Sequence, residues 1–165
     1  TLTEELDTDD CTRLVGICLS QASGADLALI SENRWYKTEN GYGGLDTHGV
    51  SGSLFPMPIK DQEMVSILPT GWRGNIETVT FTGARIKELL ETGYEKNGLS
   101  FPYQLVTPDG MTLDDDTVYT AVICGVTDEV AAEGNLTDTG ILGLDAMKEY
   151  LGRSDTLSKD DLRWE

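Results

Sequence analysis

The chain has few basic residues. It carries 12 Lys and Arg against 29 Asp and Glu, and its formal net charge is −17. The basic residues are scattered along the sequence and form no run. Nucleic acids and anionic membranes are bound through clustered Lys and Arg, so neither is expected as a partner. The binding of a free nucleotide is still compatible with this charge, because a few local arginines can outweigh a distant acidic background.

Long apolar runs are also lacking, so no membrane span is predicted. No basic and apolar leader opens the chain. The chain begins at Thr1 without a methionine, which is typical of an excised or processed fragment. The excess of acid is compatible with a secreted or surface protein.

Cysteine and histidine are scarce. Cys11, Cys18 and Cys124 are odd in number and have no C-x-x-C spacing, which argues against a disulfide framework or a thiolate metal site. They are predicted to be small buried hydrophobes. His48 is the single histidine, and a loop histidine without chemistry is the favoured interpretation. A Ser-His-Asp arrangement stays formally open, but no nucleophile-elbow sequence supports it.

The remaining sequence predicts one domain over residues 1–152 and a polar tail or linker over residues 153–165. The expected helices cover residues 8–22, 60–67, 83–92 and 144–151, with a helical turn at 127–133. The expected strands cover residues 26–30, 75–81, 101–106, 117–124 and 139–142. Helices and strands mix without strict alternation, so the predicted fold class is α+β, with a mixed sheet and packed helices. Residues 31–59 form a long irregular segment, which is usually functional or disordered.

Residues 68–91 carry the clearest local pattern. Alternation predicts a strand with Ile76 on one face and Val79 and Phe81 on the other. Thr82 is expected to cap a following amphipathic helix, and Gly93 is a natural stop for it.

This stretch resembles the C-terminal domain of the 5'-nucleotidase family, two-domain metallophosphoesterases. In that family a Pro-Phe-Gly-Asn turn enters a strand ending Leu-Thr-Gly, and a helix ending Leu-Leu-Glu follows. Here Pro69, Gly74 and Asn75 keep most of the turn, Thr82-Gly83 end the strand, and Leu89-Leu90-Glu91 close the helix. Further segments that resemble the family, in the same order, are Ala25–Ile30, Val106–Val122, Thr139–Leu142 and Asp145–Leu151.

The resemblance implies a substrate-binding-type domain acting on nucleotides or related phosphate esters. The metal-dependent catalytic domain would be a separate N-terminal metallophosphoesterase domain in cis, and it would carry the divalent metal ions. No catalytic residue, metal ligand or cofactor is therefore expected in this chain, which should not hydrolyse phosphate esters alone. The resemblance also implies an extracellular, periplasmic or cell-surface location.

Five residues are candidate substrate contacts by this resemblance. Asn33 and Arg34 follow the first strand, where the family places arginines that grip the polar end of the nucleotide, although an exposed polar loop is an equal interpretation. Trp72 and Arg73 lie in the longer turn, where Trp72 either stacks on a base or packs on its own loop. Asn75 ends the turn. Val126 stands where the family has a second stacking aromatic ring.

Other candidate motifs favour structural roles. Gly41-Tyr42-Gly43-Gly44 lacks the Lys-Ser/Thr of a P-loop. A flexible loop is the favoured interpretation of this segment, and a ligand-binding loop is the alternative. Residues 7–10 and 114–116 hold acidic groups without the pattern of a calcium loop, and they are predicted to serve a helix start and a hairpin bend. The main alternative function is a non-catalytic binding or assembly module that kept the fold and lost the nucleotide site.

Overall fold

The structure is a computed structural model of the whole chain, and it describes every residue except 32–34, 38–42, 46–49, 51–52, 72 and 97–98. For residues 35–37, 43–45, 94–96 and 99–101 it describes the backbone. The helices are α1 (Thr8–Ser23), α2 (Asp61–Ile67), α3 (Gly83–Thr92), α4 (Asp128–Glu133), α5 (Gly143–Leu151) and the 3₁₀ helix η1 (Lys159–Asp161). Among the described residues no helix is both long and apolar enough to cross a membrane.

The central sheet has five strands in the order β7-β1-β8-β4-β9. They are β1 (Leu27–Ser31), β4 (Asn75–Thr82), β7 (Tyr103–Val106), β8 (Val118–Cys124) and β9 (Thr137–Leu142). β1 runs parallel to β8, and the other pairings are antiparallel. The sheet is therefore mixed, which confirms the predicted α+β fold class.

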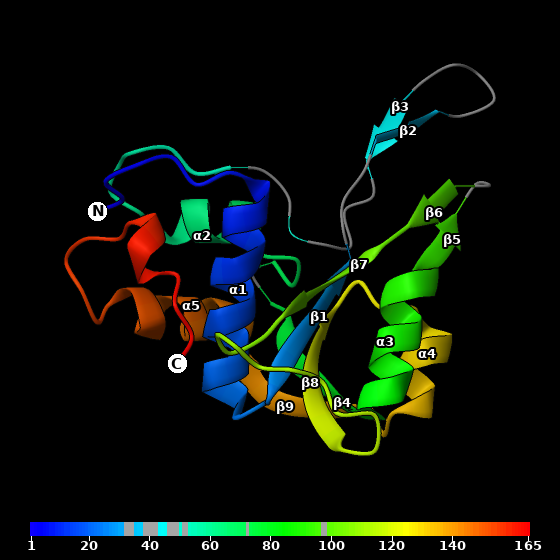
Figure 1. Cartoon of the computed structure of the whole chain (residues 1–165). Coiled ribbons are helices and arrows are strands. Elements are labelled where there is room, and N and C mark those ends of the chain that lie inside the picture. Colours follow the sequence, from blue (N-terminus) through cyan, green and yellow to red (C-terminus); the bar gives the residue numbers. More distant parts are fainter. Residues whose placement is uncertain (32–34, 38–42, 46–49, 51–52, 72, 97–98) are drawn as a thin grey trace.

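Helices cover both faces of this sheet (Figure 1). On one face α1, α2 and α5 bury a large apolar cluster that includes Leu14, Ile30 and Met147. On the other face α3 and α4 pack over a second cluster that includes Phe81 and Ile86. The sheet thus lies between two apolar layers, and β1 is buried along its whole length, whereas the edge strand β9 has no fully buried residue.

The strand and helix predicted in residues 68–91 form as expected. Ile76 belongs to the first cluster, whereas Val79 and Phe81 belong to the second, as alternation along β4 requires. The Thr82 side chain accepts a hydrogen bond of 3.2 Å from the Arg85 N–H and caps α3. Gly93 ends α3 with a φ of 57°, a backbone conformation that favours glycine.

The acidic groups near residues 7 and 114 take structural roles. Asp7 accepts from the Asp10 N–H at 2.8 Å, and the Asp10 carboxylate accepts from the Asp7 N–H at 3.1 Å, a capping box at the start of α1. Asp114 accepts from the backbone N–H groups of Asp116 and Thr117 in the bend before β8. The described residues hold no cluster of three or more potential metal ligands.

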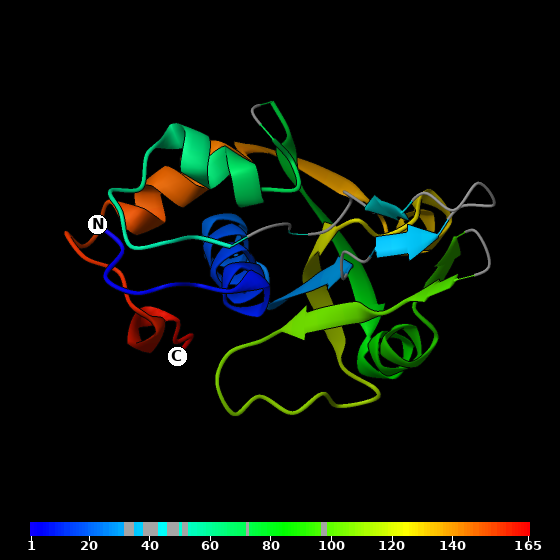
Figure 2. The same cartoon turned by 90° about the horizontal axis from the view of Figure 1, so that it is seen from above.

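Two regions differ from the prediction. The sequence predicts irregular chain over residues 31–59 and a single strand over residues 101–106. Within residues 31–59, β2 (Trp35–Lys37) and β3 (Gly43–Leu45) pair as an antiparallel ribbon. The expected strand 101–106 is divided between β6 (Leu99–Phe101) and β7, and β6 pairs with β5 (Tyr94–Lys96). Both ribbons lie outside the central sheet (Figures 1 and 2). Short strands of three residues give too little alternation to be found by pattern.

Residues 153–165 are not the free polar tail or linker that the sequence suggests. Leu157, Leu162 and Trp164 are buried in the first apolar cluster. Leu2 pairs with Leu157 in a parallel bridge, and the two chain ends lie near each other (Figure 1). The three apolar side chains follow no helical or strand period, so the sequence pattern does not reveal their burial.

Candidate functional site

The candidate site lies at one edge of the central sheet. β1 and β8 are parallel, with Ile30 opposite Cys124, so their carboxyl ends meet at this edge. β4 runs antiparallel to β8 and begins at the same edge, with Asn75. In open sheets with parallel strands, ligands bind beyond the carboxyl ends of the strands. This edge is therefore where the topology favours a binding site.

A cavity of about 190 Å³, which we call the edge cavity, opens here. Its lining comes from the turn before β4, the start of β4 and the end of β8. The residues are Pro69, Thr70, Asn75, Glu77, Ile123, Cys124, Gly125 and Val126. The fold thus joins two segments, the turn and the end of β8, that the resemblance assigns separately to substrate binding.

Asn75 is the predicted contact that lines the edge cavity. Its Nδ2 donates to the two carboxylate oxygens of Asp138 at 3.1 and 3.4 Å. The Gly140 N–H donates to the same carboxylate at 2.8 Å and holds it in place. One N–H of the amide is directed at Asp138, so the Asn75 side chain keeps a second N–H as a donor and its carbonyl oxygen as an acceptor.

Glu77 gives the edge cavity a negative wall. It is exposed, and it lies directly opposite Asp138 across the antiparallel pair of β4 and β9. Like charges in opposite positions repel each other. The ion pairs of the described residues involve neither of these carboxylates. Negative charge is therefore concentrated at this wall.

The turn that carries Thr70 is packed tightly against the start of α5. A Cβ on Gly74 would lie 2.3 Å from the Thr70 carbonyl oxygen, and one on Gly143 would lie 2.5 Å from the Thr70 Oγ1. Gly74 therefore requires glycine, because the close atom is backbone, whereas at Gly143 the Thr70 side chain would have to shift. The Gly143 N–H donates to the Gly74 carbonyl at 3.0 Å. The Thr70 hydroxyl is buried in this contact and has no hydrogen-bond partner among the described residues.

Cys124 lines the edge cavity, and its thiol is inert. It is a free, buried cysteine, and burial raises the pKa of its thiol to about 12. A neutral thiol is a poor nucleophile and a poor metal ligand. Cys11 and Cys18 are likewise free and buried, which confirms the prediction that all three are small core residues.

The other predicted contacts do not line the edge cavity in the described part of the chain. Arg73 is exposed and is not among the lining residues. Asn33, Arg34 and Trp72 lie outside the described residues, as does His48. β1 ends at Ser31, two positions before Asn33, at the edge that holds the cavity.

Sequence reasoning missed Thr70 and Glu77 as cavity residues. The alternation along β4 puts Glu77 on the same face as Val79 and Phe81, but that pattern does not show that β9 places Asp138 beside it. Thr70 stands in the lengthened turn, where its neighbours in space, Gly74 and Gly143, are far apart in sequence. A carboxylate in a strand that starts at a ligand-binding turn is the signal that would have identified Glu77.

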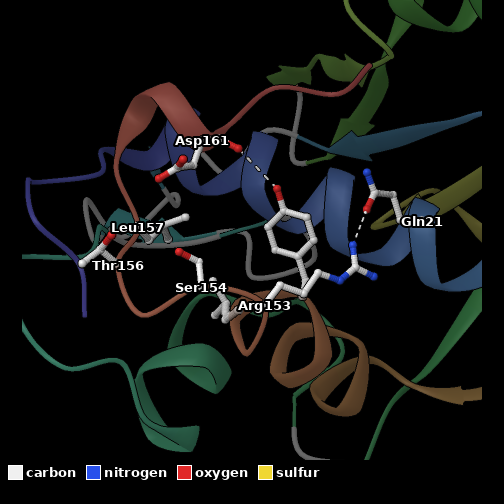
Figure 3. Close-up of a pocket in the computed structure, with 8 residues that line it drawn as sticks. Gln21, Arg153, Ser154, Thr156, Leu157 and Asp161 are labelled. Carbon is white, nitrogen blue, oxygen red and sulfur yellow. Dashed lines mark hydrogen bonds between the residues drawn. The ribbon is translucent and has the colours of Figure 1, made fainter.

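A larger cavity of about 330 Å³ lies between α1, the end of α5 and the C-terminal segment (Figure 3). Arg153 donates to Gln21 at 3.1 Å and lies 5.5 Å from the ring centre of Tyr150, whose hydroxyl donates to the Asp161 carbonyl. The guanidinium points toward Gln21 and away from Ser154 and Thr156 (Figure 3). The polar groups of this larger cavity do not converge on one point. None of the predicted substrate contacts lines it. We therefore prefer the smaller edge cavity.

Comparison of the sequence with protein-family models and with curated proteins gave no match.

Proposed function

We propose that this chain is the substrate-binding-type C-terminal domain of a 5'-nucleotidase-like phosphoesterase that acts on nucleotides or related phosphate esters. The observation that carries the proposal is the convergence of Asn75 with Gly125 and Val126 in one cavity, at the carboxyl edge of β1 and β8. Of these, Asn75 and Val126 stand at positions that the resemblance links to substrate binding. Asn33 and Arg34, which lie outside the described residues, are proposed contacts from the sequence, two and three positions after the end of β1.

In this proposal the domain positions the substrate and a partner domain performs the chemistry. An N-terminal metallophosphoesterase domain in cis would hold divalent metal ions, which generate the attacking hydroxide and stabilise the transferring phosphoryl group. The Asn75 carbonyl oxygen would accept a hydrogen bond from the ligand, and Asp138 would keep the amide oriented. The isolated chain would bind without hydrolysing. An extracellular, periplasmic or cell-surface location follows from the same resemblance.

One observation favours a second candidate function, a binding or assembly module that has lost the nucleotide site. No aromatic side chain lines the edge cavity in the described part of the chain, and Val126 stands where the family has a stacking ring. Stacking on an aromatic face contributes about 1–3 kcal/mol per base in nucleic-acid complexes. Loss of such a ring would lower the affinity of a nucleotide site considerably.

The two candidates are separated by titrating the chain with AMP, adenosine and a sugar phosphate, followed by calorimetry and tryptophan fluorescence. The proposal predicts saturable binding that Asn75→Ala weakens about tenfold, the effect of one lost hydrogen bond. Gln62→Ala, an exposed amide on α2 outside the cavity, serves as the control and should leave binding unchanged. Trp72→Ala should also weaken binding if Trp72 stacks on the base.

The absence of a response to any of the three ligands at millimolar concentration would contradict the nucleotide proposal. That result would favour the non-catalytic module.

A further inference from the structure

The larger cavity, of about 330 Å³, is separate from the edge cavity, and we call it the helix-end cavity. The two lie at opposite ends of α5. Gly143, the first residue of α5, is bonded to the turn beside the edge cavity, whereas Tyr150 and Leu151 at its other end line the helix-end cavity. Small-molecule sites are typically cavities of about 300–1,000 Å³. The helix-end cavity therefore has the size of a site for one small ligand.

The fold holds the walls of the helix-end cavity in place. Leu157 is buried, and its N–H and carbonyl are bonded to the backbone of Thr1 and Thr3, both at 2.9 Å. Tyr150 is half-buried, and its hydroxyl donates to the Asp161 carbonyl at 3.3 Å. These contacts fix the C-terminal segment against α1 and the end of α5. The cavity is therefore formed before any ligand binds.

The polar side chains of this cavity offer both donors and acceptors. Ser154 and Thr156 are exposed, and their hydroxyls can donate and accept. The Asp161 Oδ2 accepts at the start of η1, and its Oδ1 can accept from a ligand. The Gln21 carbonyl oxygen accepts from Arg153 at 3.1 Å, which leaves the two amide N–H groups of Gln21 as donors.

These polar groups are spread around the helix-end cavity. The Arg153 guanidinium points toward Gln21, away from Ser154 and Thr156, and Asp161 lies on the side opposite Gln21 (Figure 3). A phosphate or carboxylate is bound by donors that converge on it, and an amino acid needs a cation and an anion close together. A sugar ring instead carries hydroxyls around its whole edge, and each of them donates and accepts. The dispersed arrangement therefore matches a sugar ring.

The charges of the cavity also disfavour an anion. Arg153 already lies 3.6 Å from the Glu149 carboxylate, and Asp161 adds a negative charge to the lining. The formal net charge of the whole chain is −17. A ligand without net charge avoids this repulsion.

The apolar side chains supply the remaining requirement. A sugar ring presents C–H groups on its two faces, and Tyr150, Leu151 and Leu157 line the same cavity. The face of an aromatic ring is negative, so it attracts polarised C–H groups. The Arg153 guanidinium lies over the Tyr150 ring, 5.5 Å from its centre.

We infer that the helix-end cavity binds a neutral sugar ring. The C–H face of the sugar packs on the part of the Tyr150 ring that Arg153 leaves open, and its hydroxyls bond to the surrounding polar side chains. This site goes beyond the proposed function, because it shares no lining residue with the edge cavity.

The test is an NMR titration of the ¹⁵N-labelled 165-residue chain with methyl α-D-glucoside, methyl α-D-mannoside and N-acetylglucosamine. At least one of these sugars, at millimolar concentration, should shift the amide signals of Tyr150, Ser154 and Thr156 saturably. The signals of Asn75 and Gly125, at the edge cavity, should not move. Acetate, inorganic phosphate and glycine at the same concentrations should give no saturable shift at the helix-end cavity.

Two substitutions locate the sugar. Thr156→Ala should weaken its binding about three- to tenfold, the effect of one lost hydrogen bond. Thr112→Ala is the matched control, since Thr112 is an exposed threonine that lines neither cavity, and it should leave binding unchanged. Tyr150→Leu should weaken binding about tenfold, whereas Tyr150→Phe, which keeps the ring, should weaken it less than about threefold. Circular dichroism confirms that each variant is folded.

Three results would overturn the inference. The first is the lack of a saturable shift with all three sugars. The second is an equal response to acetate or phosphate, because it would mean that the cavity recognises charge through Arg153. The third is unchanged sugar affinity in Thr156→Ala and in folded Tyr150→Leu. None of these results bears on the edge cavity, so the proposed function is tested separately.

Discussion

Thr70 shows how much a single residue depends on its surroundings. Its hydroxyl is buried beside Gly143 and has no hydrogen-bond partner among the described residues. A buried hydroxyl without a partner destabilises the folded state, and an apolar replacement of the same shape removes that cost. We therefore expect Thr70→Val to leave the free energy of unfolding unchanged or to raise it by up to about 1 kcal/mol. Urea denaturation followed by circular dichroism measures the change.

Thr139→Val is the matched control for this prediction. The Thr139 hydroxyl donates to the Ile76 carbonyl at 2.7 Å and accepts from the Ile141 N–H at 3.2 Å. The same substitution there should lower the free energy of unfolding by about 1–2 kcal/mol, because both bonds are lost. An equal loss at the two positions would mean that the Thr70 hydroxyl is bonded in solution.

The Asp7 carboxyl makes the stability of the fold depend on pH. The hydrogen bond from the Asp10 backbone N–H lowers the pKa of the Asp7 carboxyl below its usual range. A carboxyl whose pKa is lower in the folded state stabilises the fold above its unfolded pKa, and this contribution is lost as the pH falls through the folded pKa. Asp7→Asn keeps a capping acceptor but cannot titrate.

We therefore expect the wild type to lose more stability than Asp7→Asn between about pH 5 and pH 2. Urea midpoints at several pH values across this range provide the comparison. Parallel losses in the two proteins would show that Asp7 is not among the groups responsible for acid sensitivity.

At the scale of the element, local sequence pattern predicted α1, β4 and α3 well, because β4 alternates between the two apolar clusters and both helices begin at a recognisable cap. The same method missed β2, β3 and β5, which are three residues long. Such strands are formed by their partners across the ribbon, and the pairing is not visible in either strand alone.

The junction of β4 and α3 gives the prediction at this scale. A Cβ on Gly83 would lie 1.9 Å from the Asp114 carbonyl oxygen, a backbone atom of the bend before β8. Backbone cannot yield as a flexible side chain does, so Gly83→Ala should destabilise the domain by about 1–3 kcal/mol, or prevent folding. Ala84→Ser, at the exposed next position, should have little effect. Equal unfolding midpoints for the two variants would show that the bend moves freely.

At the scale of the whole molecule, the C-terminal segment is part of the core. Trp164 is 6% exposed and its carbonyl accepts from the Asp109 N–H at 2.6 Å, while Arg13 donates to the Leu162 carbonyl at 2.7 Å. These contacts tie the last residues to α1 and to the turn after β7. Residues 153–165 therefore contribute to the stability of the domain.

Trp164→Ala should lower the free energy of unfolding by about 3–5 kcal/mol, the usual cost of removing a large buried aromatic side chain. Arg163→Ala, at the exposed preceding position, should change it by less than about 0.5 kcal/mol. Thermal or urea unfolding of the two variants tests the difference. Similar stability for both would indicate that residues 153–165 do not contribute to the core in solution.

The sequence by itself determined the class of fold and most of its elements, because periodicity and capping are local properties of the chain. It also singled out Asn75 as a candidate site residue. The tertiary structure decided what lies beside Asn75. The parallel pairing of β1 with β8 and the placement of β9 beside β4 bring Gly125, Asp138 and Glu77 to one edge. Such pairings depend on burying both faces of the sheet together, and no short stretch of sequence contains that information.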